Sequence, residues 1–92
     1  MRAPKKAISR ATEILISLGA TEVCLFGSAV SGQFTRGSDI DFAVRGLPAE
    51  NYYLAVGTLL GEVRHPIDLL DLNEDMPFAR HLLDRGKLDR VG

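Results

Sequence analysis

The sequence has a single cysteine, no tryptophan, and no apolar run long enough to cross a membrane. One cysteine, Cys24, cannot form an internal disulfide, and its apolar neighbours indicate a thiol packed as a small hydrophobe in a reducing compartment. A basic surplus is also missing, because 11 basic and 12 acidic side chains leave a net charge of −1, which argues against general nucleic-acid binding. No apolar signal core follows the charged N-terminal residues. We therefore expect a soluble, cytoplasmic protein that binds neither membranes nor nucleic acids in general.

The length of 92 residues is enough for one domain, so we expect residues 1–92 to form a single unit. A chain of this size buries only about two-thirds of the surface that its unfolded form exposes. Its residues are nevertheless 46% apolar, which is a high share for a small monomer. This surplus favours a protein partner or a second copy of the chain that covers part of the surface.

Apolar periodicity along the chain predicts helices that alternate with short strands. Helical spacing is found in residues 5–18, which Gly19 ends, in residues 52–63, and in a last segment that begins at Asn73 or Asp75 and ends at Gly86. Short apolar strands are predicted at 21–26, 40–44 and 67–70, and the start of a short helix is predicted at 28–31. The order α-β-α-β-α-β-α is typical of an α/β (α+β) fold with one sheet of about three core strands and helices packed around it.

The first candidate site is the turn Gly27-Ser28, where a predicted strand runs into a helix start. Such a turn presents free backbone N–H groups that can bind a phosphate, and the serine hydroxyl can donate one more hydrogen bond. The glycine spacing also matches a P-loop, but Gln33 and Phe34 occupy the places of the required Lys and Ser or Thr. The P-loop interpretation therefore fails, and a strand-to-helix turn without a ligand stays the alternative.

The second candidate site is acidic. Asp39 and Asp41 are two residues apart on a predicted strand, so both side chains leave the same face while Ile40 points to the core. Carboxylates in this arrangement can bind Mg²⁺ together with water and phosphate oxygens. Asp68 lies in an apolar run, where a lone charge needs compensation, and it can share a face with the other two. The alternatives are a solvated strand edge for the pair and a surface salt bridge for Asp68.

The string GSAVSGQFTRGSDIDFAV resembles the Gly-Ser, ten residues, Asp-x-Asp signature of the DNA polymerase β-like nucleotidyltransferases. Within that group the chain is most similar to the minimal nucleotidyltransferases, known as MNT domains. Ser38 fits their Ser-Asp-x-Asp form, and the triplet around Asp68 fits the strand that carries their third carboxylate. The resemblance implies a mixed sheet with helices packed around it, and a magnesium-dependent transferase that uses ATP or another NTP.

The resemblance also implies a role for each matching residue. Asp39, Asp41 and Asp68 would be the catalytic residues and metal ligands, with two Mg²⁺ ions bound to the triphosphate of the nucleotide. Gly27, Ser28 and Ser38 would bind the nucleotide. Small members of the family resemble antitoxins that transfer AMP to a paired HEPN-domain toxin, so the resemblance implies a partner of that type.

The chain departs from the family pattern in the segment after Gly-Ser, where members often carry arginines and this sequence has Ala29 and Ser31. Arg36 and Arg45 are the candidates that could replace them. We expect His65 and His81 to be ordinary surface or helix-end residues rather than zinc ligands. Two rival functions stay open: a non-catalytic binding module of the same fold, and a receiver-type signalling domain, which also gathers acidic residues at strand ends.

Overall fold

The fold is taken from a computed structural model, which describes residues 4–27, 38–63, 65–72 and 89–92. The secondary structure in these residues comprises α1 (Lys5–Ser17), β1 (Glu22–Phe26), β2 (Ile40–Arg45), the 3-10 helix η1 (Ala49–Asn51), α3 (Tyr52–Glu62), β3 (Ile67–Asp71) and β4 (Asp89–Arg90). The helix start predicted at 28–31 and the last predicted helix lie outside the described residues. No helix within the described residues is both long and apolar enough to span a membrane.

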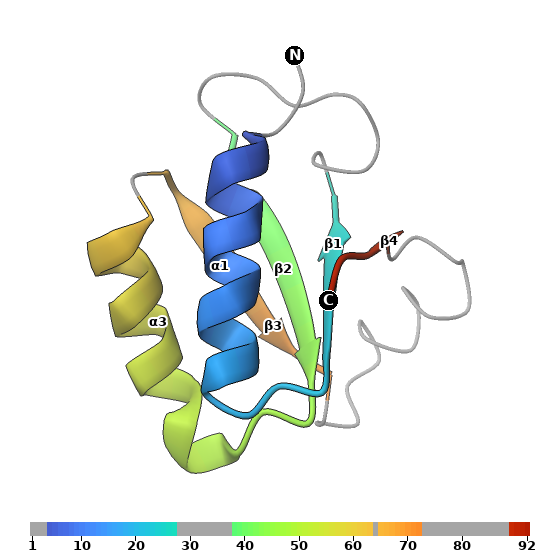
Figure 1. Cartoon of the computed structure of the whole chain (residues 1–92), viewed down its shortest axis with the longest axis vertical. Helices are drawn as coiled ribbons and strands as arrows, with labels where there is room; N and C mark the ends of the chain where they lie inside the picture. The colour runs from blue at the N-terminus through green and yellow to red at the C-terminus, as the bar shows by residue number, and fades with distance from the viewer. Residues whose placement is uncertain (1–3, 28–37, 64, 73–88) are drawn as a thin grey trace.

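The strands form one mixed sheet in the order β3-β2-β1-β4 (Figure 1). β1 pairs antiparallel with both β2 and β4, whereas β2 and β3 are parallel. A parallel pair needs a crossover connection, and here η1 and α3 supply it. The predicted mixed α/β architecture with three core strands is confirmed. The fourth strand, β4, was not predicted, because its two charged residues carry no apolar pattern.

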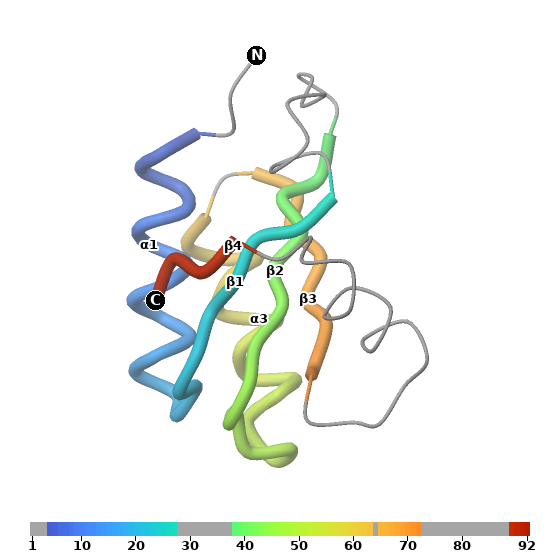
Figure 2. Tube along the Cα trace, turned by 90° about the vertical axis from the view of Figure 1, so that its right-hand side faces the viewer, coloured from blue at the N-terminus to red at the C-terminus, as the bar shows by residue number. Residues whose placement is uncertain are grey.

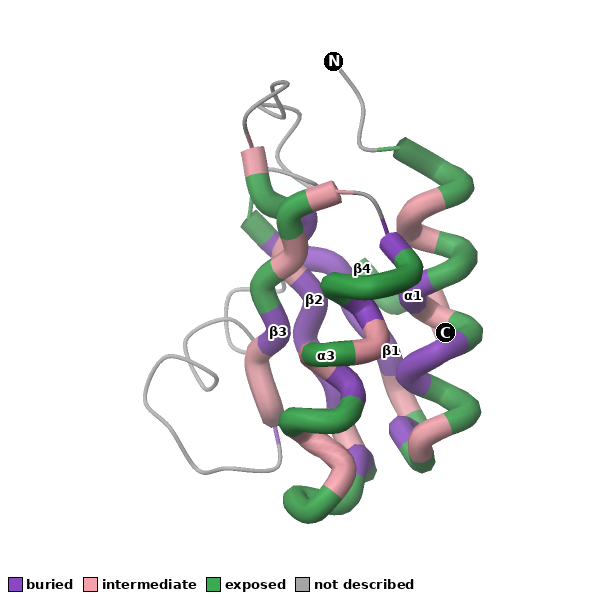
Figure 3. The backbone as a smooth tube through the Cα atoms, turned by 90° about the vertical axis from the view of Figure 1, so that its left-hand side faces the viewer, coloured by how far each residue is buried: buried purple, intermediate pink, exposed green. Residues whose placement is uncertain are grey.

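Helices α1 and α3 cover the same face of the sheet and enclose the main core (Figure 2). Along β2, Ile40, Phe42 and Val44 are fully buried against these helices, as period-2 alternation requires. Helix α1 contributes a stripe of buried residues at helical spacing, including Ala11 and Leu15. Figure 3 shows this stripe as the buried, purple side of α1, which faces the sheet.

The opposite face of the sheet carries a second, smaller apolar cluster formed by Cys24, Phe26, Ala43 and Leu72. Cys24 and Phe26 on β1 and Ala43 on β2 alternate with the core residues of those strands, so they point away from α1 and α3. Leu72, which follows β3, packs with them. Burial confirms the prediction that Cys24 packs as a small hydrophobe. Asp41 belongs to this second face, because it lies between Ile40 and Phe42, which both enter the main core.

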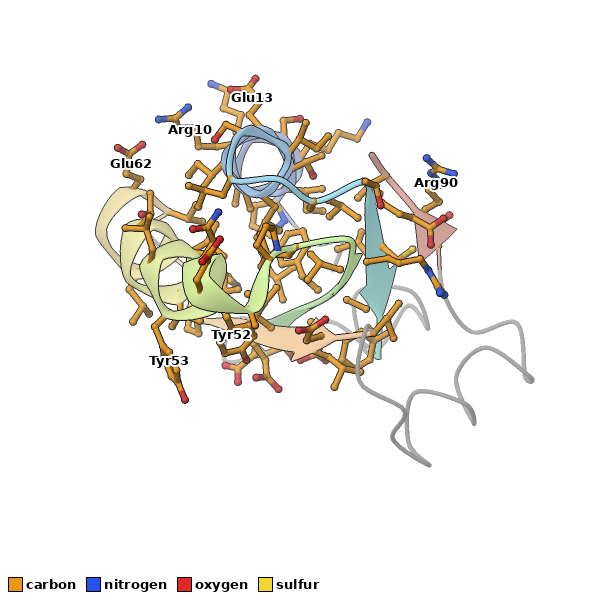
Figure 4. The ribbon with its side chains drawn as sticks, turned by 90° about the horizontal axis from the view of Figure 1, so that it is seen from below. Arg10, Glu13, Tyr52, Tyr53, Glu62 and Arg90 are labelled. Carbon is orange, nitrogen blue, oxygen red and sulfur yellow. The ribbon has the colours of Figure 1, made fainter. Side chains whose placement is uncertain are left out.

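Polar contacts join the helices to each other and to the sheet. The Arg10 guanidinium on α1 pairs with the Glu62 carboxylate on α3, and Figure 4 shows the two side chains at the outer edge of the helical layer. The Tyr52 hydroxyl donates a hydrogen bond of 2.7 Å to the Leu69 carbonyl, which ties α3 to the edge strand β3. Its neighbour Tyr53 extends away from the protein and is 84% exposed (Figure 4).

Candidate active site

The two aspartates of the Asp-x-Asp pair lie at the beginning of β2. Asp41 is the second residue of the strand and is half-buried, while Asp39 immediately precedes the strand and is exposed. Between them, Ile40 is fully buried in the main core, as the sequence predicted. The core therefore fixes the backbone between the two carboxylates, although neither carboxylate enters it.

Asp68 comes next to Asp41 through the parallel pairing of β2 and β3. The register aligns the Cα atom of Asp41 with that of Asp68. Adjacent strands lie about 4.8 Å apart, and aligned residues project from the same face of a sheet. Leu69, the next residue, is buried in the main core and donates its backbone N–H to the Asp68 carboxylate over 3.1 Å. Asp68 is thus on the same side of the sheet as Asp41, at the exposed edge strand.

The charges of the two neighbouring aspartates act on Asp41. Burial raises the pKa of the Asp41 carboxyl, and the nearby charges of Asp68 and Asp39 raise it further. A carboxylate that is partly desolvated and next to two like charges is stabilised by a proton or by a cation. The arrangement therefore favours a bound cation at this end of the sheet.

Gly27 closes the site from the side of β1. Its φ angle of +66° lies in the left-handed region, which side chains other than glycine rarely adopt. A Cβ atom at this position would lie 2.3 Å from Oδ2 of Asp41, so the backbone of the turn rests directly against that carboxylate. Antiparallel pairing brings about this contact, because Phe26 at the end of β1 is aligned with Asp41.

The side chains at this site have the chemistry of magnesium ligands. All three candidate ligands are carboxylates, which are the oxygen donors that Mg²⁺ prefers, and the close turn at Gly27 holds one of them in place. Within the described residues, however, no three acidic, His or Cys side chains converge as a ready-made metal site. Mg²⁺ commonly takes one or two carboxylates and fills its other positions with water and substrate phosphates. The donors fit a Mg²⁺ ion that keeps several of its positions for other oxygen ligands.

Of the other predicted positions, the structure describes Ser38 and Arg45. Ser38 is half-buried just before Asp39. Ser28 and Arg36 lie outside the described residues, as does His81. Arg45 is at the opposite end of β2 from the aspartates, and its guanidinium Nε lies 3.5 Å from the Glu22 carboxylate on β1. It does not take the place of an arginine beside the Gly-Ser turn.

His65 is a residue whose place the sequence did not reveal. We expected an ordinary surface or helix-end side chain, but the ring is partly buried and its Nε2 lies 3.1 Å from the carbonyl oxygen of Ser38. The contact was not expected, because it joins residues 27 positions apart and depends on the strand pairing. Histidine spacing in a sequence can indicate metal binding, but no pattern in the sequence marks a contact to a distant backbone carbonyl.

Comparison with known proteins agrees with this architecture. A family model described as "Polymerase beta, Nucleotidyltransferase" matches residues 11–88. A crystal structure of a toxin-antitoxin with AMP-PNP is 22% identical, covers 96% of this chain and 72% of its own, and has a TM-score of 0.67. A toxin-antitoxin MntA-HpeT mutant, with two aspartates changed to glutamate, is 20% identical and covers 89% of this chain and 69% of its own, also with a TM-score of 0.67. No curated protein sequence matched the chain.

Proposed function

Because the chain belongs to the polymerase beta nucleotidyltransferase family, we propose that it transfers a nucleoside monophosphate, AMP from ATP, to an acceptor hydroxyl. One observation carries the proposal: the parallel register aligns Asp68 with Asp41, and the turn at Gly27 lies directly against the Asp41 carboxylate. Phosphoryl chemistry depends mainly on position and charge, so a small domain with this arrangement is sufficient. The family assignment also disfavours the receiver-type alternative.

Each residue has a distinct role in the proposed reaction. Asp39 and Asp41, with Asp68 completing one site, would hold the Mg²⁺ that binds the triphosphate, while Gly27, Ser28 and Ser38 contact the triphosphate itself. Asp68 orients the acceptor hydroxyl and takes its proton. The hydroxyl oxygen then forms a bond to the α-phosphorus, and the bond from that phosphorus to the bridging oxygen breaks, which releases pyrophosphate. Two Mg²⁺ ions, when bound, would stabilise the charge on the attacking and leaving oxygens.

The acceptor in this proposal is a protein of the HEPN type, encoded next to this chain. Two solved structures with this fold are toxin-antitoxin structures, and one of them contains AMP-PNP, an ATP analogue. The mutant complex changes two aspartates that are two positions apart, which is the spacing of Asp39 and Asp41. The outer side of α3 exposes Tyr53, Leu54 and Leu60, and exposed apolar groups on one helix favour a surface that a partner covers. A second copy of the chain is the other candidate for that surface.

A labelling experiment tests the proposed transfer. The protein is incubated with α-labelled ATP, Mg²⁺ and the product of the adjacent reading frame, and label is sought on both proteins. We expect transfer by the wild type and its loss in Asp39→Asn and Asp41→Asn. Glu13→Gln removes one negative charge on the exposed side of α1, and this matched control should transfer as the wild type does.

The competing function is a binding module of the same fold that neutralises its partner without chemistry. Ala29 and Ser31 occupy positions where family members often carry arginines, and this difference favours the binding module. If the wild type transfers no label and binds no ATP in a magnesium-dependent way, yet forms a tight complex, the proposed transferase activity is wrong. The binding module then becomes the better account.

A further inference from the structure

The segment between α3 and β3 is bonded to the residues that precede β2. His65 and Pro66 form the short connection that leads into β3. The ring Nε2 of His65 lies 3.1 Å from the carbonyl oxygen of Ser38, and the Pro66 carbonyl accepts a hydrogen bond of 2.9 Å from the Ile40 amide. Asp39 is the residue between these two contacts, so its backbone is held on both sides by the same connection.

The direction of the histidine bond follows from its partner. A carbonyl oxygen can only accept a hydrogen bond, so Nε2 of His65 carries the proton and donates it to Ser38. Two amino acids later, Ile40 is anchored by complete burial in the core. Asp39 has no such anchor, because its side chain is exposed and it lies before the first residue of the strand. The bonds at Ser38 and Ile40 are therefore the described contacts that fix the backbone next to its carboxylate.

We infer that His65 is a positioning residue, whose side chain sets the direction in which the Asp39 carboxylate leaves the chain, so that Asp39 and Asp41 face the same ligand. The inference rests on the proposed function of these aspartates. The bond from Ile40 to Pro66 uses backbone atoms alone, whereas the bond to Ser38 depends on the imidazole. Because β3 begins two residues after His65, the same connection carries both this anchor and Asp68. The imidazole thus couples the position of the Asp-x-Asp pair to that of the third carboxylate.

Two substitutions separate the hydrogen bond from the space that the ring fills. His65→Phe keeps a ring of similar size but cannot donate to Ser38. His65→Gln places an amide N–H close to the position of Nε2 and can donate. Small displacements of reacting groups reduce rates strongly, so we expect His65→Phe to lower kcat for nucleotide transfer by about tenfold or more. The KM for ATP should change less, and His65→Gln should restore most of kcat.

Amide hydrogen exchange supplies a readout that does not depend on activity. We expect exchange at Asp39 and Ile40 to be faster in His65→Phe than in the wild type and in His65→Gln, while the urea midpoints of unfolding stay similar. If His65→Phe transfers and exchanges like the wild type, or if both variants are impaired equally, the inference is wrong. If the wild type transfers nothing, the proposed function fails, and the exchange data alone still decide whether His65 positions Asp39.

Discussion

Replacing Gly27 with alanine should disrupt the site at its closest backbone contact. The residue has a φ of +66°, and an added Cβ would approach Oδ2 of Asp41 to 2.3 Å, a distance at which something must shift. A side chain in the left-handed region costs roughly 1–2 kcal/mol in stability. The displaced carboxylate should also weaken magnesium-dependent ATP binding, by about tenfold or more if it behaves like other disturbed metal-site groups.

Gly46→Ala provides a matched control at the far end of β2. Gly46 also has a positive φ, +81°, and its added Cβ would lie 2.3 Å from Oγ1 of Thr21. We expect a comparable loss of stability, because both glycines have a positive φ and an added Cβ would make an equally close contact at each. We expect no change in ATP affinity. Urea unfolding measures the first quantity, and calorimetric titration with ATP at saturating Mg²⁺ measures the second.

The comparison refutes the reasoning if the two variants behave alike. Equal ATP affinities in Gly27→Ala and Gly46→Ala, measured where both proteins are fully folded, would show that the turn does not shape the nucleotide site. An affinity that falls equally in both would assign the effect to general destabilisation. Only a selective loss in Gly27→Ala supports the close contact with Asp41 as part of the binding site.

Three further predictions concern titration, thiol reactivity and packing. Because the pKa of Asp41 is raised above its ordinary value of 3.8 in the folded state, the folded protein binds this proton at a higher pH than the unfolded chain does, so this group should add stability to the metal-free wild type as the pH falls through the raised pKa toward 3.8. Asp41→Asn should lack this gain when urea unfolding is followed in EDTA. Cys24 is buried and burial raises the pKa of its thiol, so iodoacetamide at pH 8 should modify it only after unfolding, as mass spectrometry would show. Tyr52→Phe should cost about 1 kcal/mol in unfolding free energy by losing the bond to Leu69, whereas Tyr53→Phe at an exposed position should cost nothing measurable.

Local patterns in the sequence were sufficient for much of the fold. The helical spacing of α1 and the stop at Gly19 predicted that helix, and short apolar runs predicted β1, β2 and β3. The backbone confirms that α1 ends at this glycine, since Gly19 has a positive φ. The amides of Gly19 and Ala20 also donate hydrogen bonds to carbonyls in the last turn of α1. β4 could not be predicted, because a two-residue strand of charged residues is defined by its partner β1 and not by its own composition.

The arrangement of the candidate site was only partly predictable. Alternation along β2 predicted that Ile40 enters the core between two aspartates that stay outside it, and burial confirms the place of Ile40, since that depends on local geometry alone. The alignment of Asp68 with Asp41 depends on the direction and register of strand pairing, which no local pattern encodes. The same reason hid the contact from His65 to Ser38. The roles of these residues in transfer stay predictions until the labelling experiment is done.

The parallel β2–β3 pair has a consequence for how the protein matures. All of η1 and α3 lies between the two strands in the sequence, so the ribosome must synthesise β3 before it can pair with β2. Pairing over such a distance requires loop closure, which makes it slow compared with local helix formation. A nascent chain that has emerged only through β2 would display the Asp-x-Asp pair without its third carboxylate. Chemical competence should therefore appear late, as the final stage of folding rather than an early one.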